Sequence, residues 1–357
     1  MKYIFIVQGE GRGHITQAIT LSELLRRNGH EVLEVLTGKS KNREIPPFFF
    51  EKIGASVSTF ETPSFILKKN RKNIHIAKTI LYNMHPKQLN TYHKSIEFIY
   101  KRIQKLSPDV ILNFYEPLIA VTCLKYNLKI PIISIGHQFL FKHPDFKFAN
   151  FKEKNILFFR LFTHLCQTGS SKILALSFYD MNDCPAERLL VVPPLVRQEV
   201  RTLIPSKKSY ILGYLTSIGF EKEVREWHKK HPETELHFFQ DRTEDEYRID
   251  KTLTLHAVND VKFLEYMAEC RGFISTAGFE SVCEAMYLDK SIMLVPFHVE
   301  QEINALDAAS TGSSMIAQSF NISLLLDFIE KRNYDVEYFK KWVDSAEEIF
   351  LKQLTDD

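Results

Sequence analysis

The sequence has 357 residues, of which 45% are hydrophobic and 25% are charged, and its formal net charge is +2. This composition is typical of a soluble globular protein and excludes a fibrous or disordered chain. The length leaves room for two domains that each bury a core, and the lack of any apolar run of roughly 18 residues excludes a membrane-spanning helix. Five cysteines without a C-x-x-C pair argue against a disulfide framework or a metal site, and the short apolar start argues against a secretory signal. We therefore expect a cytoplasmic protein.

The two halves of the chain carry opposite charges. Residues 1–200 contain 28 basic and 16 acidic residues, a net +12, whereas residues 201–357 contain 18 and 28, a net −10. Much of the positive excess lies between Phe65 and Lys105, where ten basic residues are accompanied by one acid, Glu97. This stretch is open to two interpretations, a solvated helical surface or a patch that meets an anionic membrane or an anionic acceptor.

The first elements in the chain are a strand, a helix and a strand. Residues 3–7 form a short apolar run that ends at a glycine-rich loop, as is typical of a buried parallel strand. Residues 14–28 space their apolar side chains as a helix does, and residues 31–36 form the next strand. This βαβ unit predicts a parallel sheet. The series continues with strands at 110–112, 131–135, 172–176 and 189–192 and a helix at 118–126.

A second strand–helix series follows the prolines at 193–194 and 205. Its predicted strands cover 210–215, 236–239, 253–256, 272–275 and 291–295, and its predicted helices cover 221–230, 261–268 and 279–287. The stretch 336–354 is predicted as one amphipathic helix. The predicted fold class is therefore α/β, with two doubly wound domains facing across a cleft.

The loop from Gln8 to His14 joins the first strand to the first helix, at the end of an α/β sheet where ligands bind. Its first two glycines fit a dinucleotide fingerprint, but His14 takes the third position and the acids of the second strand lie at its beginning and middle. A nicotinamide or flavin enzyme is therefore a poor fit. His14 at the mouth of the helix can take a proton from a hydroxyl, since its ordinary pKa is near ~6.5. A histidine that caps the helix or packs beneath the loop is the other interpretation.

A second site is indicated by residues 275–305. A strand ends at Ser275, and Gly278 opens a helix whose first-turn N–H groups and dipole favour a diphosphate. Ser281 adds a hydroxyl donor. Glu284 lies on the same face of the helix, where it can accept hydrogen bonds from a ribose diol.

The loop after the last of these strands carries Glu300 and Gln301, which suit the adjacent hydroxyls of a sugar. Several candidates have a plain structural alternative. Glu284 can be a helix-surface acid, Glu116 can merely cap the helix that follows it, and His137 can be an interior histidine.

The glycine loop with His14, the pattern G-x-x-S-x-x-E, and the later V-P-F and E-Q-x-x-N-A resemble the two-domain nucleotide-sugar glycosyltransferases of the GT-B fold. The closest resemblance is to the family 28-like branch with the peptidoglycan N-acetylglucosaminyltransferase and the galactolipid synthases. It implies an acceptor-side Rossmann-like domain at 1–200, a nucleotide-sugar-binding Rossmann-like domain at 201–335, and a C-terminal helix at 336–357 that packs back on the first domain.

The resemblance also implies roles for single residues. His14 is implied as the catalytic base, with Glu116 and His137 as second choices. Arg12 stands where relatives often have a small residue, and we expect it to contact a phosphate or an acidic acceptor. The implied donor-binding residues are Gly11, Arg12, Gly13, Thr216, Ser217, Gly219, Val258, Asn259, Gly278, Phe279, Ser281, Glu284, Glu300 and Gln301.

The reaction implied is transfer of a sugar from a nucleoside diphosphate, UDP by analogy, to an acceptor hydroxyl with inversion. The chain contains no Asp-x-Asp pattern, so we expect no metal and no cofactor besides the nucleotide sugar. The expected acceptor is lipid-linked or an anionic glycan, with peripheral association at the inner membrane face, a role in cell-envelope glycan or glycolipid synthesis, and no nucleic acid partner. The alternatives are a sugar-nucleotide epimerase or hydrolase on the same fold, or a non-catalytic nucleotide-sugar-binding protein.

Overall fold

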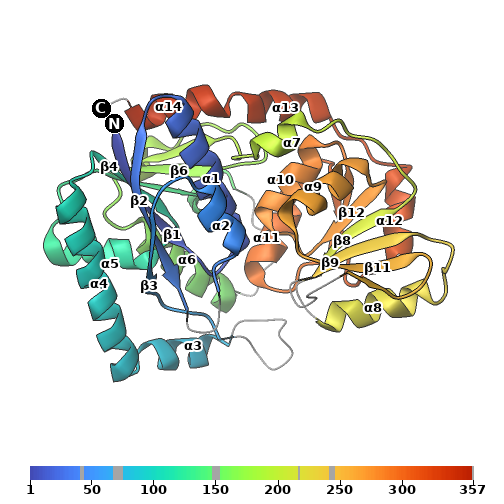
Figure 1. Cartoon of the computed structure of the whole chain (residues 1–357), viewed down its shortest axis with the longest axis horizontal. Helices are drawn as coiled ribbons and strands as arrows, with labels where there is room; N and C mark the ends of the chain where they lie inside the picture. The colour runs from blue at the N-terminus through green and yellow to red at the C-terminus, as the bar shows by residue number, and fades with distance from the viewer. Residues whose placement is uncertain (41–43, 67–74, 147–152, 216–217, 241–245, 356–357) are drawn as a thin grey trace. The chain divides into compact units, whose positions relative to one another are not determined.

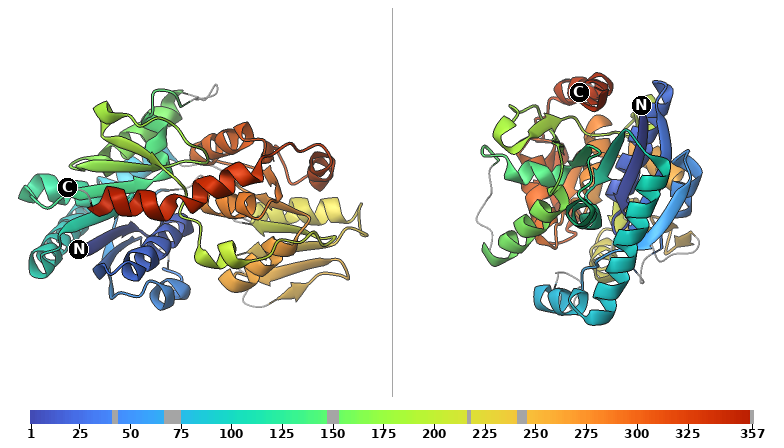
Figure 2. Two further views of the ribbon diagram at one scale, coloured as in Figure 1. Left: turned by 90° about the horizontal axis from the view of Figure 1, so that it is seen from above. Right: turned by 90° about the vertical axis from the view of Figure 1, so that its left-hand side faces the viewer.

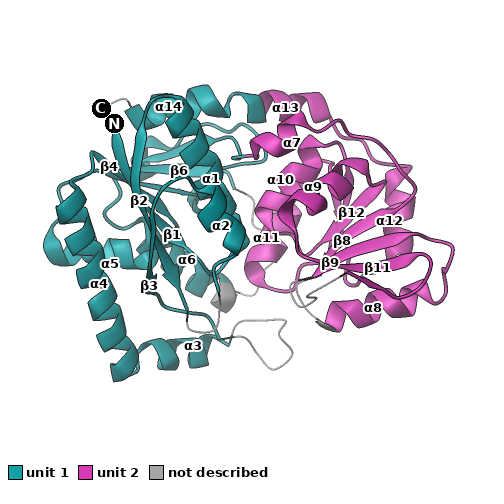
Figure 3. Cartoon of the chain, in the orientation of Figure 1, with its two compact units in different colours: residues 1–195, 343–357 teal, residues 196–342 magenta. Residues whose placement is uncertain are grey.

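The computed structural model describes residues 1–40, 44–66, 75–146, 153–215, 218–240 and 246–355. The chain forms two compact units, coloured separately in Figure 3. Unit 1 contains Met1–Leu195 and Val343–Asp357, and unit 2 contains Val196–Trp342. Both ends of the chain therefore belong to unit 1.

Unit 1 is built on a seven-stranded sheet with the order β3-β2-β1-β4-β5-β6-β7, and every neighbouring pair in it is parallel. The inner strands are apolar and fully buried, as expected when helices cover both faces of a parallel sheet. The strands are β1 (Lys2–Gln8), β2 (Glu31–Lys39), β3 (Val57–Glu61), β4 (Val110–Phe114), β5 (Ile132–Gly136), β6 (Lys172–Leu176) and β7 (Leu189–Val192). The main helices are α1 (Arg12–Arg27), α2 (Pro47–Lys52), α3 (Ile76–Asn83), α4 (Pro86–Leu106), α5 (Pro117–Tyr126), the 3₁₀ helix η1 (His137–Lys142), α6 (Glu153–Gln167) and α14 (Ala346–Thr355).

The strand order places a switch point between β1 and β4. From β1 the chain runs to β2 and β3 on one side, and it then returns to place β4 on the other side of β1. The two loops that leave the carboxyl ends of these strands therefore diverge and leave a crevice, which is where open α/β sheets bind ligands.

Unit 2 repeats this plan with the order β10-β11-β9-β8-β12-β13-β14, in which the edge strand β10 is antiparallel and the other pairs are parallel. Its switch point lies between β8 and β12. The strands are β8 (Ile211–Leu215), β9 (Leu236–Gln240), β10 (Tyr247–Arg248), β11 (Leu253–Ala257), β12 (Gly272–Ser275), β13 (Ser291–Leu294) and β14 (Ser314–Ile316). The helices are α7 (Gln198–Thr202), α8 (Ile218–His228), α9 (Asp260–Glu269), α10 (Phe279–Tyr287), α11 (Val299–Ser310), α12 (Ile322–Ile329) and most of α13 (Val336–Asp344).

The C-terminal stretch is two helices, so the prediction of one helix over 336–354 is wrong. The helical path breaks at Ser345, between α13 and α14. Serine is a weak helix former inside a helix but is favoured at the N-cap position. The Ser345 carbonyl accepts the N–H of Ile349 at 3.1 Å, as the carbonyl of an N-cap residue does.

The last helix packs on unit 1. The hydroxyl of Tyr3, at the start of β1, donates to the Leu354 carbonyl at 3.1 Å. Figures 1 and 2 accordingly show α14 beside the first strand of the chain. Within the described residues, no helix combines the length and the apolar character that crossing a membrane requires.

Candidate functional site

The loop after β1 lies against the end of β2. The Gly9 N–H donates to the Gly38 carbonyl at 2.8 Å, and a Cβ on Gly9 would lie only 2.5 Å from that oxygen. Glycine is therefore required for this approach. Gly11 is the N-cap of α1, and Arg12 and Gly13 are its first two residues.

His14 is the third residue of α1 and is buried, with 8% of its surface exposed. Its ring stacks on Tyr115, which follows β4, with centroids 5.4 Å apart. The Nδ1 atom faces the Gln17 Oε1 at 3.3 Å, and the Nε2 atom faces the Gln138 Nε2 at 3.4 Å. Because an amide oxygen only accepts and an amide nitrogen only donates, Nδ1 carries the proton and Nε2 is the basic atom.

Burial lowers the pKa of His14 to about 4, and the hydrogen bond that His14 donates to Gln17 opposes only part of this effect. The ring is therefore neutral at neutral pH, with the Nε2 lone pair available for a proton. His14 thus occupies the β1/β4 switch point in the protonation state that a general base needs.

Tyr115 and Glu116 follow β4 at the same switch point. Tyr115 has a φ of 61°, in the left-handed region, and such strain in a non-glycine residue concentrates at functional sites. Glu116 is fully buried; its Oε1 accepts from Thr62 Oγ1 at 2.6 Å and from the Leu118 N–H at 3.1 Å. Burial raises the pKa of Glu116 to about 8. Glu116 therefore caps α5 and is largely protonated at neutral pH, which makes it a poor base.

His137 begins η1 and lies inside unit 1, with 1% of its surface exposed. Its Nδ1 donates to the Leu176 carbonyl at 2.8 Å, and its ring contacts Phe141 and Phe178. Burial lowers the pKa of His137 to about 3. These contacts favour the interior histidine over the catalytic one.

Two of the predicted donor segments lie at the carboxyl ends of β8 and β11. Gly219 is in the first turn of α8, whereas Thr216 and Ser217 lie outside the described residues. Asn259 is the N-cap of α9, where its Oδ1 accepts the Lys262 N–H at 2.9 Å, and Val258 directly precedes it.

The loop after β12 is held in a strained conformation. Ala277 has a φ of 65°, in the left-handed region. The Ala277 N–H donates to Ser275 Oγ at 3.2 Å, and the Ala277 carbonyl accepts from Asn304 Nδ2 at 3.1 Å. Gly278 follows as the N-cap of α10, where no side chain caps the helix, and Phe279 is the first helical residue. A fixed loop with an uncapped helix start is suited to an anion.

Ser281 and Glu284 follow along α10. The Ser281 hydroxyl donates to the Gly278 carbonyl at 3.2 Å. Glu284 is buried, with 2% of its surface exposed, which excludes a helix-surface acid. Its Oε1 instead accepts from Arg197 Nε at 2.6 Å.

Glu300 and Gln301 lie in the first turn of α11, so their placement in a loop is wrong. The His298 side chain caps this helix and accepts the Gln301 N–H at 3.5 Å. An acidic residue in the first turn, such as Glu300, interacts favourably with the helix dipole. Gln301 binds Thr276 Oγ1 through its Nε2 at 3.2 Å and accepts the Phe297 N–H through its Oε1 at 3.3 Å. It therefore joins the loop after β13 to the loop after β12.

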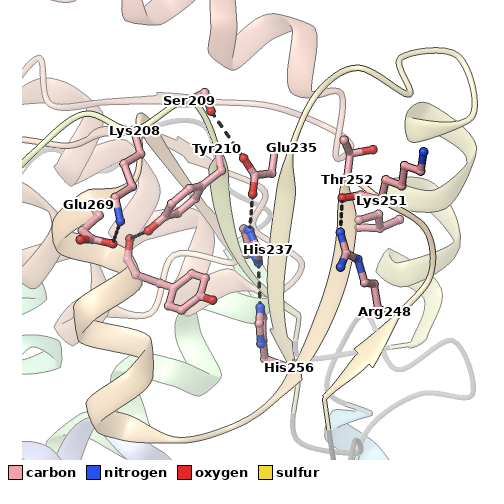
Figure 4. A network of polar contacts seen from close by, with 12 residues as sticks. Lys208, Ser209, Tyr210, Glu235, His237, Arg248, Lys251, Thr252, His256 and Glu269 are labelled. Carbon is pink, nitrogen blue, oxygen red and sulfur yellow. Dashed lines mark hydrogen bonds and ion pairs between the residues drawn. The ribbon is translucent and has the colours of Figure 1, made fainter.

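A separate polar cavity of about 430 Å³ lies at the amino ends of β8 and β9 (Figure 4). Glu235 accepts from His237 at 3.1 Å, and His237 lies 2.9 Å from His256 on the neighbouring strand. Ligands of open α/β sheets bind at the carboxyl ends of strands, so this cavity is not the donor site. It is lined by Lys208, Ser209, Tyr210, Glu235, His237, Tyr266 and Glu269.

The model of the family described as "Glycosyl transferase family 1" matches residues 1–332. The chain belongs to this family. The glycosyltransferase is also similar in fold to solved structures, at low identity. The glycosyltransferase of kitacinnamycin is 13% identical with a TM-score of 0.65, and the match covers 99% of this chain and 98% of that one. The spinosyn rhamnosyltransferase complexed with thymidine diphosphate is 12% identical with a TM-score of 0.64, and the match covers both chains completely.

A third similar structure is the Phytolacca americana glycosyltransferase UGT2, complexed with UDP-2-fluoro-glucose and pterostilbene. It is 12% identical with a TM-score of 0.65, and the match covers 98% of this chain and 96% of that one. No curated protein sequence matches the chain.

The predictions of two Rossmann-like domains and of a glycosyltransferase are confirmed. The family does not favour an epimerase, a hydrolase or a binding protein. The narrower resemblance to the peptidoglycan and galactolipid branch stays a prediction.

The sequence did not predict the contacts that hold the candidate groups in place. These contacts are made by Gln17 and Gln138 at His14, Thr62 at Glu116, Asn304 at Ala277, and Arg197 at Glu284. Gln138 carried a signal, since it follows a predicted strand as a polar residue. Arg197 carried none apart from its position next to the prolines.

Proposed function

We propose that this glycosyltransferase moves a sugar from a UDP-sugar to an acceptor hydroxyl, with inversion at the anomeric carbon and without a metal. One observation carries the proposal: the two switch points present complementary chemistry. In unit 1 the switch point holds His14 with its basic Nε2. In unit 2 it holds the uncapped helix start at Gly278. The nucleotides named for the similar structures, thymidine diphosphate and UDP-2-fluoro-glucose, support a nucleoside diphosphate donor.

The proposed reaction is a single displacement at the anomeric carbon. His14 Nε2 takes the proton of the acceptor hydroxyl while that oxygen bonds to the anomeric carbon. The bond from the anomeric carbon to the diphosphate oxygen breaks on the opposite face, and the diphosphate keeps the electron pair. The N–H groups of the first turn of α10 then meet its added negative charge. The Gln138 amide must move away from His14 Nε2 so that the acceptor hydroxyl can donate to that atom.

Metal independence can be checked directly. Because helix N–H groups stabilise the leaving diphosphate in this proposal, an excess of EDTA is expected to leave kcat/KM within about twofold of the untreated enzyme. The measurement is initial-rate kinetics before and after chelation. Loss of activity with recovery on added Mn²⁺ would show that a cation carries the diphosphate charge.

A thermal-shift panel of nucleoside diphosphates tests the donor. UDP at about 100 times its Kd is expected to stabilise the protein by about 2.7 kcal/mol, which shifts Tm by several degrees. We expect UDP to give the largest shift among UDP, TDP, ADP and GDP. No shift with any of the four contradicts the proposal, and a largest shift with another base corrects the donor to that base.

For the acceptor, we propose a lipid-linked or anionic glycan substrate met at an anionic membrane surface, in cell-envelope glycan or glycolipid synthesis on its cytoplasmic face. The support comes from the α3–α4 corner, defined as residues 76–94, where α3 lies at the end of α4 (Figure 1). No acid occurs between Glu61 and Glu97. Large apolar side chains are exposed at this corner, beside exposed lysines; they are Ile80 at 48%, Leu81 at 75%, Met84 at 61% and Leu89 at 44%, with Lys78, Lys87 and Lys94.

Exposed apolar side chains with lysines beside them are suited to the headgroup region of an anionic bilayer. Of the ten basic residues of this stretch, Lys68, Lys69, Arg71 and Lys72 lie outside the described residues. We expect the protein to sediment with vesicles rich in phosphatidylglycerol and not with phosphatidylcholine vesicles. The double variant Leu81→Ser/Met84→Ser should lose this binding, while Ile204→Ser, which changes an 87% exposed residue of unit 2, should keep it. Equal binding by both variants contradicts the membrane proposal.

A further inference from the structure

Arg197 and Glu284 form an ion pair inside unit 2, between segments 87 residues apart in the sequence. Arg197 is the N-cap of the short helix α7, and Glu284 lies in the second turn of α10. The Nε–Oε1 distance is 2.6 Å, and the two side chains are 10% and 3% exposed. The helix α7 packs directly on α10 and α9, so the pair has little freedom to separate.

The pair supplies Glu284 with a charged hydrogen-bond partner. A buried carboxylate is costly unless a cation pairs with it through a hydrogen bond, and the Arg197 Nε–H meets this need at 2.6 Å from Glu284 Oε1. The charged groups that act on the guanidinium are carboxylates, Glu284 first and then Glu199 and Asp260. Arg197 therefore holds the Glu284 side chain in place against α7.

The geometry of the pair leaves Glu284 able to accept further hydrogen bonds. A carboxylate has about four acceptor positions, and the Arg197 Nε–H takes one of them on Oε1. Glu284 follows Gly278 by six positions, which corresponds to about 9 Å along the helix axis. A ribose attached to a diphosphate at the helix start can reach this position.

We infer that Arg197 is a positioning residue for the donor: through their ion pair it holds the Glu284 carboxylate in one orientation, so that the ribose hydroxyls of the nucleotide can donate to it. This inference rests on the proposed function. The planar guanidinium gives a directed Nε–H bond that a lysine ammonium does not reproduce, so both charge and direction contribute.

The test is the discrimination between ribo and deoxyribo nucleotides. In the wild-type protein, 2′-deoxy-UDP or 3′-deoxy-UDP should bind more weakly than UDP by on the order of 10-fold or more, because a hydrogen bond to a charged group is lost. In Arg197→Met and Arg197→Lys the ratio of the Kd values should fall to within about twofold of unity. Kd is measured by calorimetry, and the Tm of each variant shows that it is folded. If Arg197→Met does not fold, the ratio measured for Arg197→Lys provides the test.

Arg332→Met is the matched control, because it also removes an ion pair of unit 2. Arg332 pairs with Asp289, which precedes β13 at the amino end of the sheet, away from the donor loops. It should lower Tm and leave the ratio unchanged.

The binding measurements distinguish an error in the positioning role of Arg197 from an error in the proposed function. If wild-type protein prefers UDP over its deoxy analogues and both Arg197 variants keep that preference, the positioning role is wrong and the proposed function stands. If wild-type protein binds UDP without such a preference, Glu284 is not the ribose ligand and the inference is overturned. If it binds no nucleoside diphosphate, the proposed function itself is overturned.

Discussion

Replacing His14 with glutamine is expected to lower kcat by about 10²- to 10⁴-fold, the range that a positioned general base contributes. Glutamine fills much of the imidazole volume beside Tyr115, but its amide cannot take a proton. The KM for the donor should change by less than about threefold, because no step of donor binding uses this side chain. Steady-state kinetics at saturating acceptor, with Tm as a check on folding, measures the effect.

The pH dependence of the wild-type enzyme adds a second readout on the same residue. Because burial lowers the pKa of His14 to about 4, the base stays unprotonated well below the ordinary histidine value of ~6.5. The acidic limb of kcat/KM should therefore not fall near pH 6.5. Exposed His93, replaced as His93→Gln, is the matched control and should leave kcat unchanged. A His14→Gln enzyme with more than about a tenth of wild-type kcat would exclude the general base role.

The sequence predicts the buried strands well, including the edge strand β7, and the partly buried edge strands poorly. Runs such as 3–7 and 272–275 are continuous and apolar because both faces of an inner parallel strand are covered, and β1 and β12 appear there. The edge strands β3 and β14 were not predicted. Most of their side chains are only partly buried, so they carry no such run.

In the candidate site, likewise, some residues are recognisable from a local sequence pattern, whereas their contacts join segments far apart in the sequence. His14 and Gly278 are readable because a glycine-rich loop between a strand and a helix is a local pattern. The contact of His14 with Gln138 spans 124 residues, and that of Glu284 with Arg197 spans 87. Such partners are fixed by the order of strands in the sheet, which periodicity in one segment does not contain. Only the folded structure therefore shows that His14 is neutral and that Glu284 is buried.

Acidification from pH 6.5 to pH 5 is expected to destabilise the protein by about 4 kcal/mol per pH unit. Burial lowers the pKa of four histidines, to about 3 for His137 and to about 4 for His14, His256 and His298. Below pH ~6.5 the unfolded chain binds a proton at each of these positions and the folded protein does not. The unfolded state then gains stability as the pH falls.

Glu116 opposes part of this effect. Burial raises its pKa to about 8, so the folded protein holds one proton that the unfolded chain lacks between about pH 4.3 and 8. Four protons gained by the unfolded state against one held by the folded state leave a difference of three, at about 1.4 kcal/mol per pH unit each. Above pH ~6.5 only Glu116, of these five groups, still differs in protonation between the folded and unfolded states, and its contribution to stability declines as the pH rises. The Tm should therefore be highest near pH 6.5.

Thermal melts across pH 5–8 measure this dependence, and a single variant isolates one of its causes. His137→Gln removes one of the four protons, so the difference falls from three to two and the acid slope should fall by about a third. The exposed control His93→Gln should leave the slope unchanged. A Tm that stays constant from pH 6.5 to pH 5 would mean that these histidines are protonated in the folded protein. His14 would then be a cation at mildly acidic pH and unable to act as the base. The stability profile and the proposed chemistry therefore depend on the same property, the neutral form of a buried imidazole.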